Sequence, residues 1–163
     1  MPTLQRTSKE IEEMYYRHVD SVYRVCYSFM KNISETEDMV QETFLRMISD
    51  GKLFESEKHE RAWLIITASN LCKDELKRHS RKNVSLEVVG DLSDPWSESN
   101  KDVLYAILHL PDKYKTVVFM YYYEGYSISE IAKYLHTMES TIRSRLLRAR
   151  KLLKMKLGGE KCD

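Results

Sequence analysis

The stretch from Ser127 to Leu153 predicts two short helices joined by a tight turn, the second of them rich in arginine. The first helix starts with a capping box, because the side chains of Ser127 and Glu130 can each accept a hydrogen bond from the other's backbone N–H. Apolar residues then recur at the three- and four-residue spacing of one helix face, namely Ile128, Ile131, Ala132 and Leu135. This arrangement favours a helix-turn-helix, whose second helix enters the major groove of DNA.

The second helix is expected to begin near Glu139 and to have two distinct faces. At about 100° per residue, one narrow stripe is apolar and should face a core: Ile142, Leu146, Ala149 and Leu153. The opposite side and its flank carry Ser140, Arg143, Ser144, Leu147, Arg148 and Lys151. A solvated basic amphipathic helix is the simple alternative. The capped helix just upstream favours DNA binding instead.

Composition predicts that the whole chain is helical. The 163 residues include only three prolines and five glycines, and no window alternates as strands do. Three helical segments are expected in the first half, over residues 8–31, 34–51 and 56–82. The second of these is predicted to begin with a capping box between Ser34 and Glu37.

Charge divides the chain into parts, although its net charge is only +1. Residues 85–102 carry a net charge of −4 and residues 103–163 one of +5. The acidic stretch SLEVVGDLSDPWSESN has no helical period and is typical of a flexible linker. We therefore predict an all-α protein of two small helical domains, with the boundaries 1–84 (first domain), 85–101 (linker), 102–157 (helix-turn-helix domain) and 158–163 (tail).

No membrane span, signal peptide, cofactor or metal site is expected. The chain has no run of about 18 apolar residues, and its N-terminus lacks the apolar core of a signal peptide. These features predict a cytoplasmic protein. Cys26, Cys72 and Cys162 form no metal-binding spacing, and the first two lie in apolar helical patterns typical of a core.

Two segments of the first half are candidate binding surfaces. In EDMVQETFLRM, a polar face that includes Asp38 and Glu42 opposes an apolar one, and a partner protein is a better functional interpretation than acid–base catalysis, which needs a desolvated pocket. The third segment combines aromatic residues near its start with cations further on, as proteins that bind single-stranded DNA do. On this segment alone, Trp63 is more often a core residue than a stacking platform.

These three motifs, in this order, resemble a bacterial sigma factor of the extracytoplasmic-function group, over nearly the whole chain. TEDMVQETFLRM is similar to the helix that such proteins dock on RNA polymerase, and RAWLIITASNLCKDELKR to the helix that reads and melts the −10 promoter element. Residues 110–153 are similar to the −35-binding domain. The resemblance implies sigma regions 2 and 4, a role in promoter-specific transcription initiation, and no catalytic residue or enzymatic activity.

The resemblance also implies roles for individual residues and partners. Contact with the beta-prime clamp helices of core RNA polymerase would involve Asp38, Gln41, Glu42 and Phe44. The −10 element would meet Trp63, Asn70, Lys73, Lys77 and Arg78, with the loop over residues 54–59 helping to capture a flipped base. The −35 element would meet Ser140, Thr141, Arg143, Ser144, Arg145, Leu147 and Arg148. Promoter DNA, the beta flap and an inhibitory anti-sigma factor are the further expected partners.

The turn before the recognition helix departs from the family pattern of Gly, an aliphatic residue and Ser or Thr. Here His136, Thr137 and Met138 take these places. His136 is expected to adopt a left-handed backbone, and Thr137 to cap the helix in place of Met138, which has no side-chain oxygen. A stand-alone helix-turn-helix regulator with a sensing or dimerising first half is the alternative function, followed by a protein-binding adaptor and, more remotely, an enzyme.

Overall fold

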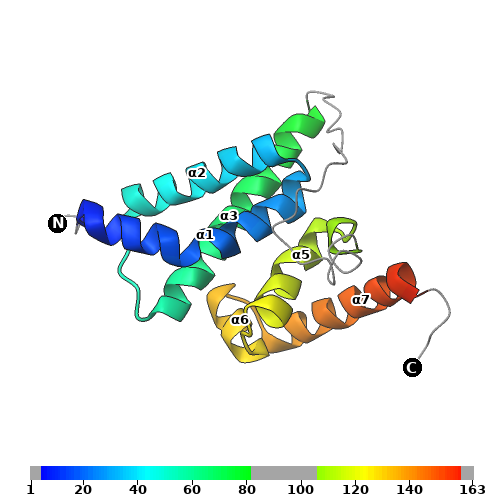
Figure 1. The fold of residues 1–163 in the computed structure, drawn as a ribbon. Coiled ribbons are helices and arrows are strands. Elements are labelled where there is room, and N and C mark those ends of the chain that lie inside the picture. The colour runs from blue at the N-terminus through cyan, green and yellow to red at the C-terminus, as the bar shows by residue number, and fades with distance from the viewer. Residues whose placement is uncertain (1–4, 82–105, 159–163) are drawn as a thin grey trace. The chain divides into compact units, whose positions relative to one another are not determined.

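In the computed structural model, described residues 5–81 and 106–158 form helices joined by short turns (Figure 1). The chain divides into two compact units, Met1–Val89 and Gly90–Asp163. The described parts contain only helical regular structure, so the predicted all-α fold is confirmed. The predicted acidic linker and nearly all of the tail lie outside the described residues.

The first unit is built from three long helices: α1 (Ser8–Met30), α2 (Ile33–Asp50) and α3 (Glu57–Arg81). Each packs against the other two. A complete capping box between Thr7 and Glu10 begins α1. The core between the helices is apolar, and its fully buried members include Val22, Val25, Cys26, Ala62, Leu64, Ile65, Ala68 and Cys72.

The start of α2 differs from the prediction. Asn32 caps this helix, with its side-chain oxygen accepting a hydrogen bond from the Glu35 N–H at 2.8 Å, so the predicted capping box through Ser34 is wrong. The reason lies in the preceding turn, where Lys31 ends α1 in a left-handed conformation with φ of 64°. This sharp turn puts the extended residue at Asn32, and Ser34 already lies in the first turn of α2.

The start of α3 follows the predicted boundary closely. The Ser56 hydroxyl accepts a hydrogen bond from the His59 N–H at 3.1 Å, which satisfies a donor of the first helical turn. Gly51, with φ of 66°, ends α2 five residues earlier. A short loop over residues 51–56 therefore connects α2 to α3.

The second unit contains α5 (Asp112–Val118), the π-helical turn η2 (Phe119–Tyr123), α6 (Ile128–Tyr134) and α7 (Glu139–Gly158). The sequence also predicts a short helix over residues 102–110, ended by Pro111, and another over residues 112–123. The first of these is described only from residue 106. The helix expected over 112–123 is present, but its last turn is π-helical. The Glu124 N–H bonds to the Phe119 carbonyl there, and Gly125 follows with φ of 73°.

Candidate nucleic-acid interface

The helix-turn-helix of the second unit has the predicted capping box at its start. The Ser127 hydroxyl accepts from the Glu130 N–H at 3.1 Å, and the Glu130 carboxylate accepts from the Ser127 N–H at 3.0 Å. Ile131 and Ala132 turn into the core of this unit. The first helix of the pair is therefore held at its start by hydrogen bonds and on one face by packing.

The turn between the two helices is closed by the backbone. His136 has φ of 54°, so the expected left-handed conformation is confirmed. The Met138 carbonyl accepts from the N–H groups of Thr141 and Ile142, which makes Met138 the residue that precedes the first turn of α7. Thr137, the residue expected to cap α7, lies one residue before that position, and its N–H bonds to the Ala132 carbonyl.

The two faces of α7 are those predicted from its periodicity. Ile142, Leu146 and Ala149 have no exposed surface, and Leu153 is half-buried. Of the residues expected at the −35 element, Thr141 and Arg145 are half-buried. The others are exposed: Ser140, Arg143, Ser144, Leu147 and Arg148.

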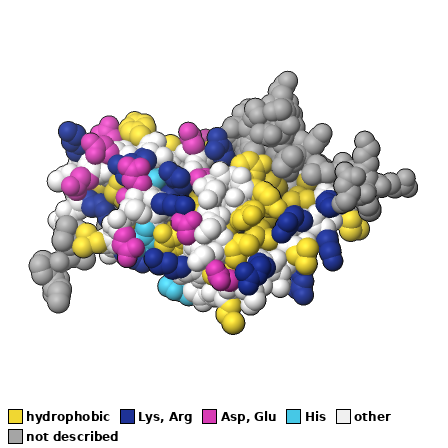
Figure 2. All heavy atoms as spheres, turned by 90° about the horizontal axis from the view of Figure 1, so that it is seen from below, with side chains coloured by type: hydrophobic (Ala, Val, Ile, Leu, Met, Phe, Trp, Pro, Cys, Tyr) yellow, Lys and Arg dark blue, Asp and Glu magenta, His cyan; other side chains and the backbone are white. Residues whose placement is uncertain are grey.

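Leu147 is notable in this set, because it is a large apolar side chain that is 51% exposed. Figure 2 shows several Lys and Arg side chains over α7 and few acidic side chains beside them. The outer face of α7 thus combines cations and hydroxyls with exposed apolar side chains, among them Leu147, which suits contact with phosphates and base edges.

On α3, the residues expected at the −10 element lie on the side away from the core. Trp63, Asn70 and Lys77 are seven residues apart and so share one helix face. Asn70 and Lys77 are exposed, and Trp63 is half-buried. Lys73 is half-buried on the flank, and Arg78 is exposed with its guanidinium 2.6 Å from the Glu75 carboxylate.

Trp63 belongs to an aromatic cluster at the start of α3 rather than to the core. Its ring centroid lies 5.7 Å from that of Phe54, which in turn lies 5.3 Å from the ring of His59. The Nδ1 atom of His59 accepts a hydrogen bond from the Glu55 N–H at 3.1 Å. The loop residues 54–56 are therefore held against the first turn of α3, to which residues 57–59 belong.

On α2, the residues expected to meet the polymerase differ in their exposure to solvent. Asp38, Gln41 and Glu42 are exposed, whereas Phe44 is buried, with its ring centroid 4.9 Å from that of Tyr15 on α1. Phe44 can therefore shape this surface but offers little area of its own.

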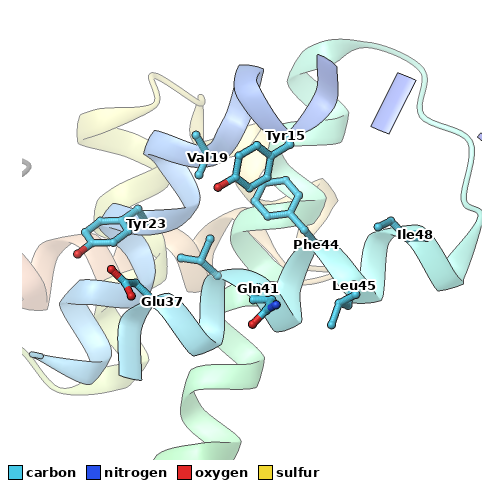
Figure 3. A pocket seen from close by; sticks show the side chains of 9 residues that line it. Tyr15, Val19, Tyr23, Glu37, Gln41, Phe44, Leu45 and Ile48 are labelled. Atoms are coloured by element: carbon cyan, nitrogen blue, oxygen red, sulfur yellow. The ribbon is translucent and has the colours of Figure 1, made fainter. Parts of the chain in front are cut away.

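An open groove between α1 and α2 adjoins the exposed face of α2 (Figure 3). Its volume is about 550 Å³. Tyr15, Val19 and Tyr23 line it from α1, and the α2 side consists of Glu37, Val40, Gln41, Phe44, Leu45 and Ile48. The α1 side of the groove was not predicted from the sequence, although the four-residue spacing of its three members was a usable signal.

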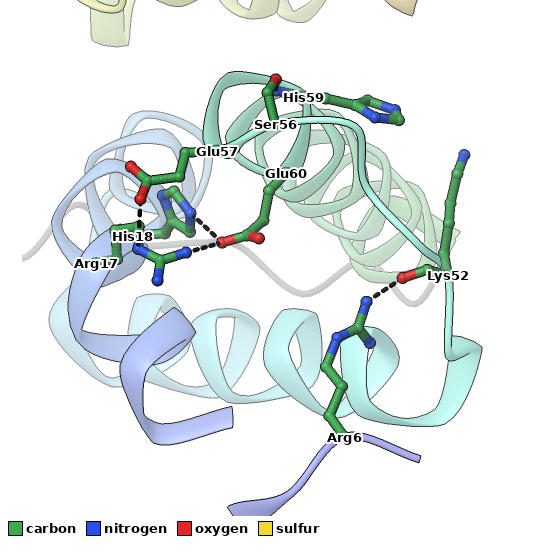
Figure 4. Close-up of polar contacts among 8 residues, drawn as sticks. All are labelled: Arg6, Arg17, His18, Lys52, Ser56, Glu57, His59 and Glu60. Atoms are coloured by element: carbon green, nitrogen blue, oxygen red, sulfur yellow. Dashed lines mark hydrogen bonds and ion pairs between the residues drawn. The ribbon is translucent and has the colours of Figure 1, made fainter. Parts of the chain in front are cut away.

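A polar network joins α1 to the start of α3 (Figure 4). Glu60 is nearly buried, and its Oε1 atom lies 2.6 Å from Nε2 of the fully buried His18 and 2.7 Å from Nη1 of Arg17. The Nδ1 atom of His18 is buried without a hydrogen-bond partner. This geometry suits a neutral His18 that donates from Nε2, because a proton on Nδ1 would have no acceptor.

We expect acid to weaken the first unit through His18. Burial lowers the pKa of His18 below its ordinary value of 6.5, against the opposing effect of the Glu60 hydrogen bond and charge, and the charges of Arg61 and Arg17 lower it further. The unfolded chain therefore takes up a proton at a higher pH than the folded protein does. The free energy of unfolding should fall as the pH drops below about 6.5.

Urea unfolding at a series of pH values measures this dependence. A His18→Gln variant keeps a side-chain N–H for Glu60 but does not titrate, so its stability should change less over the same pH range. An equal pH dependence in both proteins would show that His18 is not responsible.

Two parts of the chain match family models that describe two regions of the same class of transcription factor. The family profile described as Sigma-70 region 2 matches residues 14–82, and the one described as Sigma-70, region 4 matches residues 101–153. These matches correspond to the two helical units, of which the second carries the helix-turn-helix. The fold and the matched regions thus define a sigma factor.

Relatives over most of the chain narrow this class. The ECF RNA polymerase sigma factor SigW of Bacillus subtilis (strain 168) is 28% identical over 156 residues, which are 85% of this chain and 83% of SigW. SigM of the same organism is 29% identical over 152 residues, which are 88% of this chain and 93% of SigM. The chain belongs to the sigma-70 family and is an extracytoplasmic-function sigma factor, which directs promoter-specific initiation by RNA polymerase.

A solved structure shares the fold. It is the co-crystal structure of the sigma factor RpoE in complex with the anti-sigma factor NepR from Bartonella quintana, with a TM-score of 0.76 and 20% identity. The match covers 94% of this chain and 99% of that one.

The sequence also predicts no enzymatic activity, no membrane span and no metal site. The sigma factor family is not enzymatic, as the sequence analysis predicts. Within residues 5–81 and 106–158, no helix is long and apolar enough to cross a membrane. The same residues contain no group of three His, Cys, Asp or Glu side chains that could hold a metal ion.

Proposed function

We propose that three helix faces of this sigma factor make its contacts with promoter DNA and with RNA polymerase. The outer face of α7 reads the −35 element, the exposed face of α3 with the loop over residues 54–59 captures the −10 strand, and the exposed face of α2 docks on the polymerase. The observation that carries this proposal is the arrangement of α7, where Ile142, Leu146 and Ala149 are fully buried and most of the cations and hydroxyls are exposed.

The domain boundaries are part of the same proposal. Residues 1–84 act as region 2 and residues 102–157 as region 4, with residues 85–101 as a tether and residues 158–163 as a tail. A tether allows two DNA-binding faces to reach two separated promoter elements on one polymerase. The protein works in the cytoplasm, where its polymerase is.

The docking surface consists of the exposed polar groups of α2 and the rim of the adjacent groove. Gln41 takes part in both, because it lies on the exposed face and also lines the groove. The clamp helices of the beta-prime subunit supply an elongated surface that can cover such a face. The beta flap is the corresponding partner of region 4.

Replacing Gln41 and Glu42 together by alanine should weaken binding to core polymerase by about 1 kcal/mol, or roughly fivefold. Both side chains are exposed, so their loss should leave the fold intact. Competition with the unmodified chain for core polymerase measures the change. Glu12→Ala is the matched control, since it removes an exposed carboxylate from α1, and equal affinities of all three proteins would remove the α2 face from the proposal.

The −10 surface places an amide where a flipped base can meet it. Asn70 is exposed, and its amide can both donate to and accept from a base edge. Lys77 lies one heptad further along the same face, where a cation can contact the phosphate backbone.

Asn70→Ala should reduce discrimination at one −10 position by about 1 kcal/mol, while polymerase binding stays unchanged. Discrimination should fall because the alanine side chain cannot hydrogen-bond a base. Polymerase binding should not change because residue 70 lies on α3, away from the proposed docking face of α2. Open-complex formation on promoters that vary at each −10 position measures this effect, with Ser80→Ala as an exposed control on the same helix. An unchanged pattern of base preference would exclude Asn70 from base capture.

An anti-sigma factor is the proposed inhibitor. The related structure of RpoE contains the anti-sigma factor NepR, and an inhibitor of this chain would act by covering the α2 face or a DNA-binding face. The chemistry of such an inhibitor follows from the surface it covers, with apolar groups for the groove and acidic ones for α7.

Reconstituted transcription tests the proposed function as a whole. The chain is combined with core polymerase and genomic DNA, and the start sites of the transcripts are mapped. We expect defined start sites that share elements near −35 and −10. Transcripts without shared elements, or a chain that binds duplex DNA tightly but never associates with core polymerase, would contradict the proposal.

A further inference from the structure

We propose that Arg6 is a positioning residue for −10 strand capture, because it holds the loop between α2 and α3 in the shape that the loop needs for DNA. This inference rests on the proposed function of that loop. Arg6 precedes residue 14, where the match to sigma region 2 begins, so Arg6 itself lies outside the matched region, whereas the residues that it contacts lie inside it.

Arg6 contacts the last turn of α2 and the start of the following loop through the two terminal nitrogens of its guanidinium group. Its Nη1 donates to the Met47 carbonyl at 3.4 Å, and its Nη2 donates to the Lys52 carbonyl on the far side of Gly51 (Figure 4). The last turn of α2 contains no basic residue of its own. Arg6 therefore supplies the positive charge that the carbonyl end of a helix favours.

The same guanidinium lies over the ring of Phe54, with 5.3 Å between its carbon atom and the ring centroid. Phe54 contacts the rings of His59 and Trp63 in turn. Arg6 thus connects the end of α2 to the aromatic cluster at the start of α3. A shift of Phe54 would move both of its aromatic neighbours.

The far end of the loop is held separately. Glu60, one residue after His59, is bound by His18 and Arg17 of α1, and Ser56 and His59 pair through the helix cap. Figure 4 shows both attachments, with Arg6 at Lys52 and the Glu60 group at the start of α3. The loop is therefore anchored at both ends, and Arg6 is the anchor that a substitution can release without disturbing the buried one.

A lysine cannot reproduce this contact. The planar guanidinium stacks on a ring and donates in two directions at once, whereas an ammonium group is a single compact charge. Arg6→Ala removes all three contacts, and Arg6→Lys keeps only the charge. Lys9→Ala is the matched control, because Lys9 is an exposed cation three residues away in the first turn of α1.

The experiment uses full-length chain assembled with core polymerase and a promoter found by start-site mapping, with its −10 region opened as a mismatched bubble. The bubble removes the need for melting, so binding reports capture of the non-template strand. Arg6→Ala should lower the affinity for the matched strand by about tenfold, which corresponds to about 1.4 kcal/mol. It should also reduce the preference for the matched over a mismatched −10 base, with polymerase affinity unchanged.

Arg6→Lys should fall between Arg6→Ala and the unmodified protein, and Lys9→Ala should match the unmodified protein. A second measurement does not depend on DNA: backbone hydrogen exchange over residues 51–56 in the free chain should become faster in Arg6→Ala only. Loss of polymerase affinity together with strand affinity would indicate general unfolding and overturn the positioning role.

Failure of this inference is distinguishable from failure of the proposed function. If the unmodified holoenzyme captures the strand and Asn70→Ala alters base preference, but Arg6→Ala behaves as Lys9→Ala does, only the role of Arg6 is wrong. If the unmodified holoenzyme does not capture the strand, the proposed function is wrong, and the inference about Arg6 is then wrong as well. Unchanged hydrogen exchange in Arg6→Ala would by itself disprove that Arg6 holds the loop.

Discussion

Glu60→Ala should lower the free energy of unfolding of the first unit by about 2–3 kcal/mol. The substitution removes the acceptor of the fully buried His18 and leaves both ring nitrogens of that side chain without a partner. Arg17 also loses its closest carboxylate, although it is about one-third exposed and can turn to water. The larger part of the cost therefore comes from His18 rather than from the ion pair.

Two control variants separate these contributions. Glu60→Gln keeps an oxygen that can accept from His18, so it should lose much less stability than Glu60→Ala. Arg17→Ala leaves the His18–Glu60 hydrogen bond in place and should cost less still. Urea unfolding followed by Trp63 fluorescence in a Trp96→Phe background measures all three, since the chain has only two tryptophans. Equal losses for Glu60→Ala and Glu60→Gln would contradict the hydrogen-bond argument.

Local sequence signals predicted the helices well because a helix is determined mainly by residues close together in the chain. The stripe of Ile142, Leu146 and Ala149 predicted the buried side of α7 from periodicity alone. The capping box at Ser127 was equally local. The failure at Ser34 arose because Lys31, rather than a glycine, takes the left-handed position, which moves the start of α2.

The π-helical turn in the second unit could not be predicted from local sequence signals. Three consecutive tyrosines on a helix cannot all be buried, and the structure exposes Tyr121 and Tyr122 while Tyr123 packs on Phe119. The single wider turn lets Phe119 and Met120 both stay in the core before Gly125. Periodicity of 3.6 residues cannot predict a turn that departs from it.

Two contacts of the N-terminal part of the first unit were also missed, for a different physical reason. His18 meets Glu60, and Arg6 meets Lys52, across more than 40 residues of sequence. No local pattern relates residues at such distances. The exposed faces of α2, α3 and α7 were easier to predict because each lies on a single helix, although the half-buried position of Trp63 depended on Phe54 in the loop.

Arg143→Ala should weaken recognition of one −35 base pair by about 1–3 kcal/mol, if Arg143 reads a base edge. The side chain is exposed in the second turn of α7, beside Ser144 and near Leu147. An arginine in such a place can donate two hydrogen bonds to a guanine edge, and alanine can donate none. Affinity of the holoenzyme should therefore fall on the preferred promoter and change little on promoters altered at that base pair.

Arg148→Ala is the matched comparison, because it removes the same group from the same helix at a position expected to meet phosphate. It should weaken all −35 sequences alike and reduce the slope of log affinity against log salt by about 1. Affinity titrations of both variants on a panel of −35 sequences at several salt concentrations separate the two roles. A uniform loss for Arg143→Ala would assign it to the phosphate backbone, and base recognition would then depend on Ser144 and Leu147.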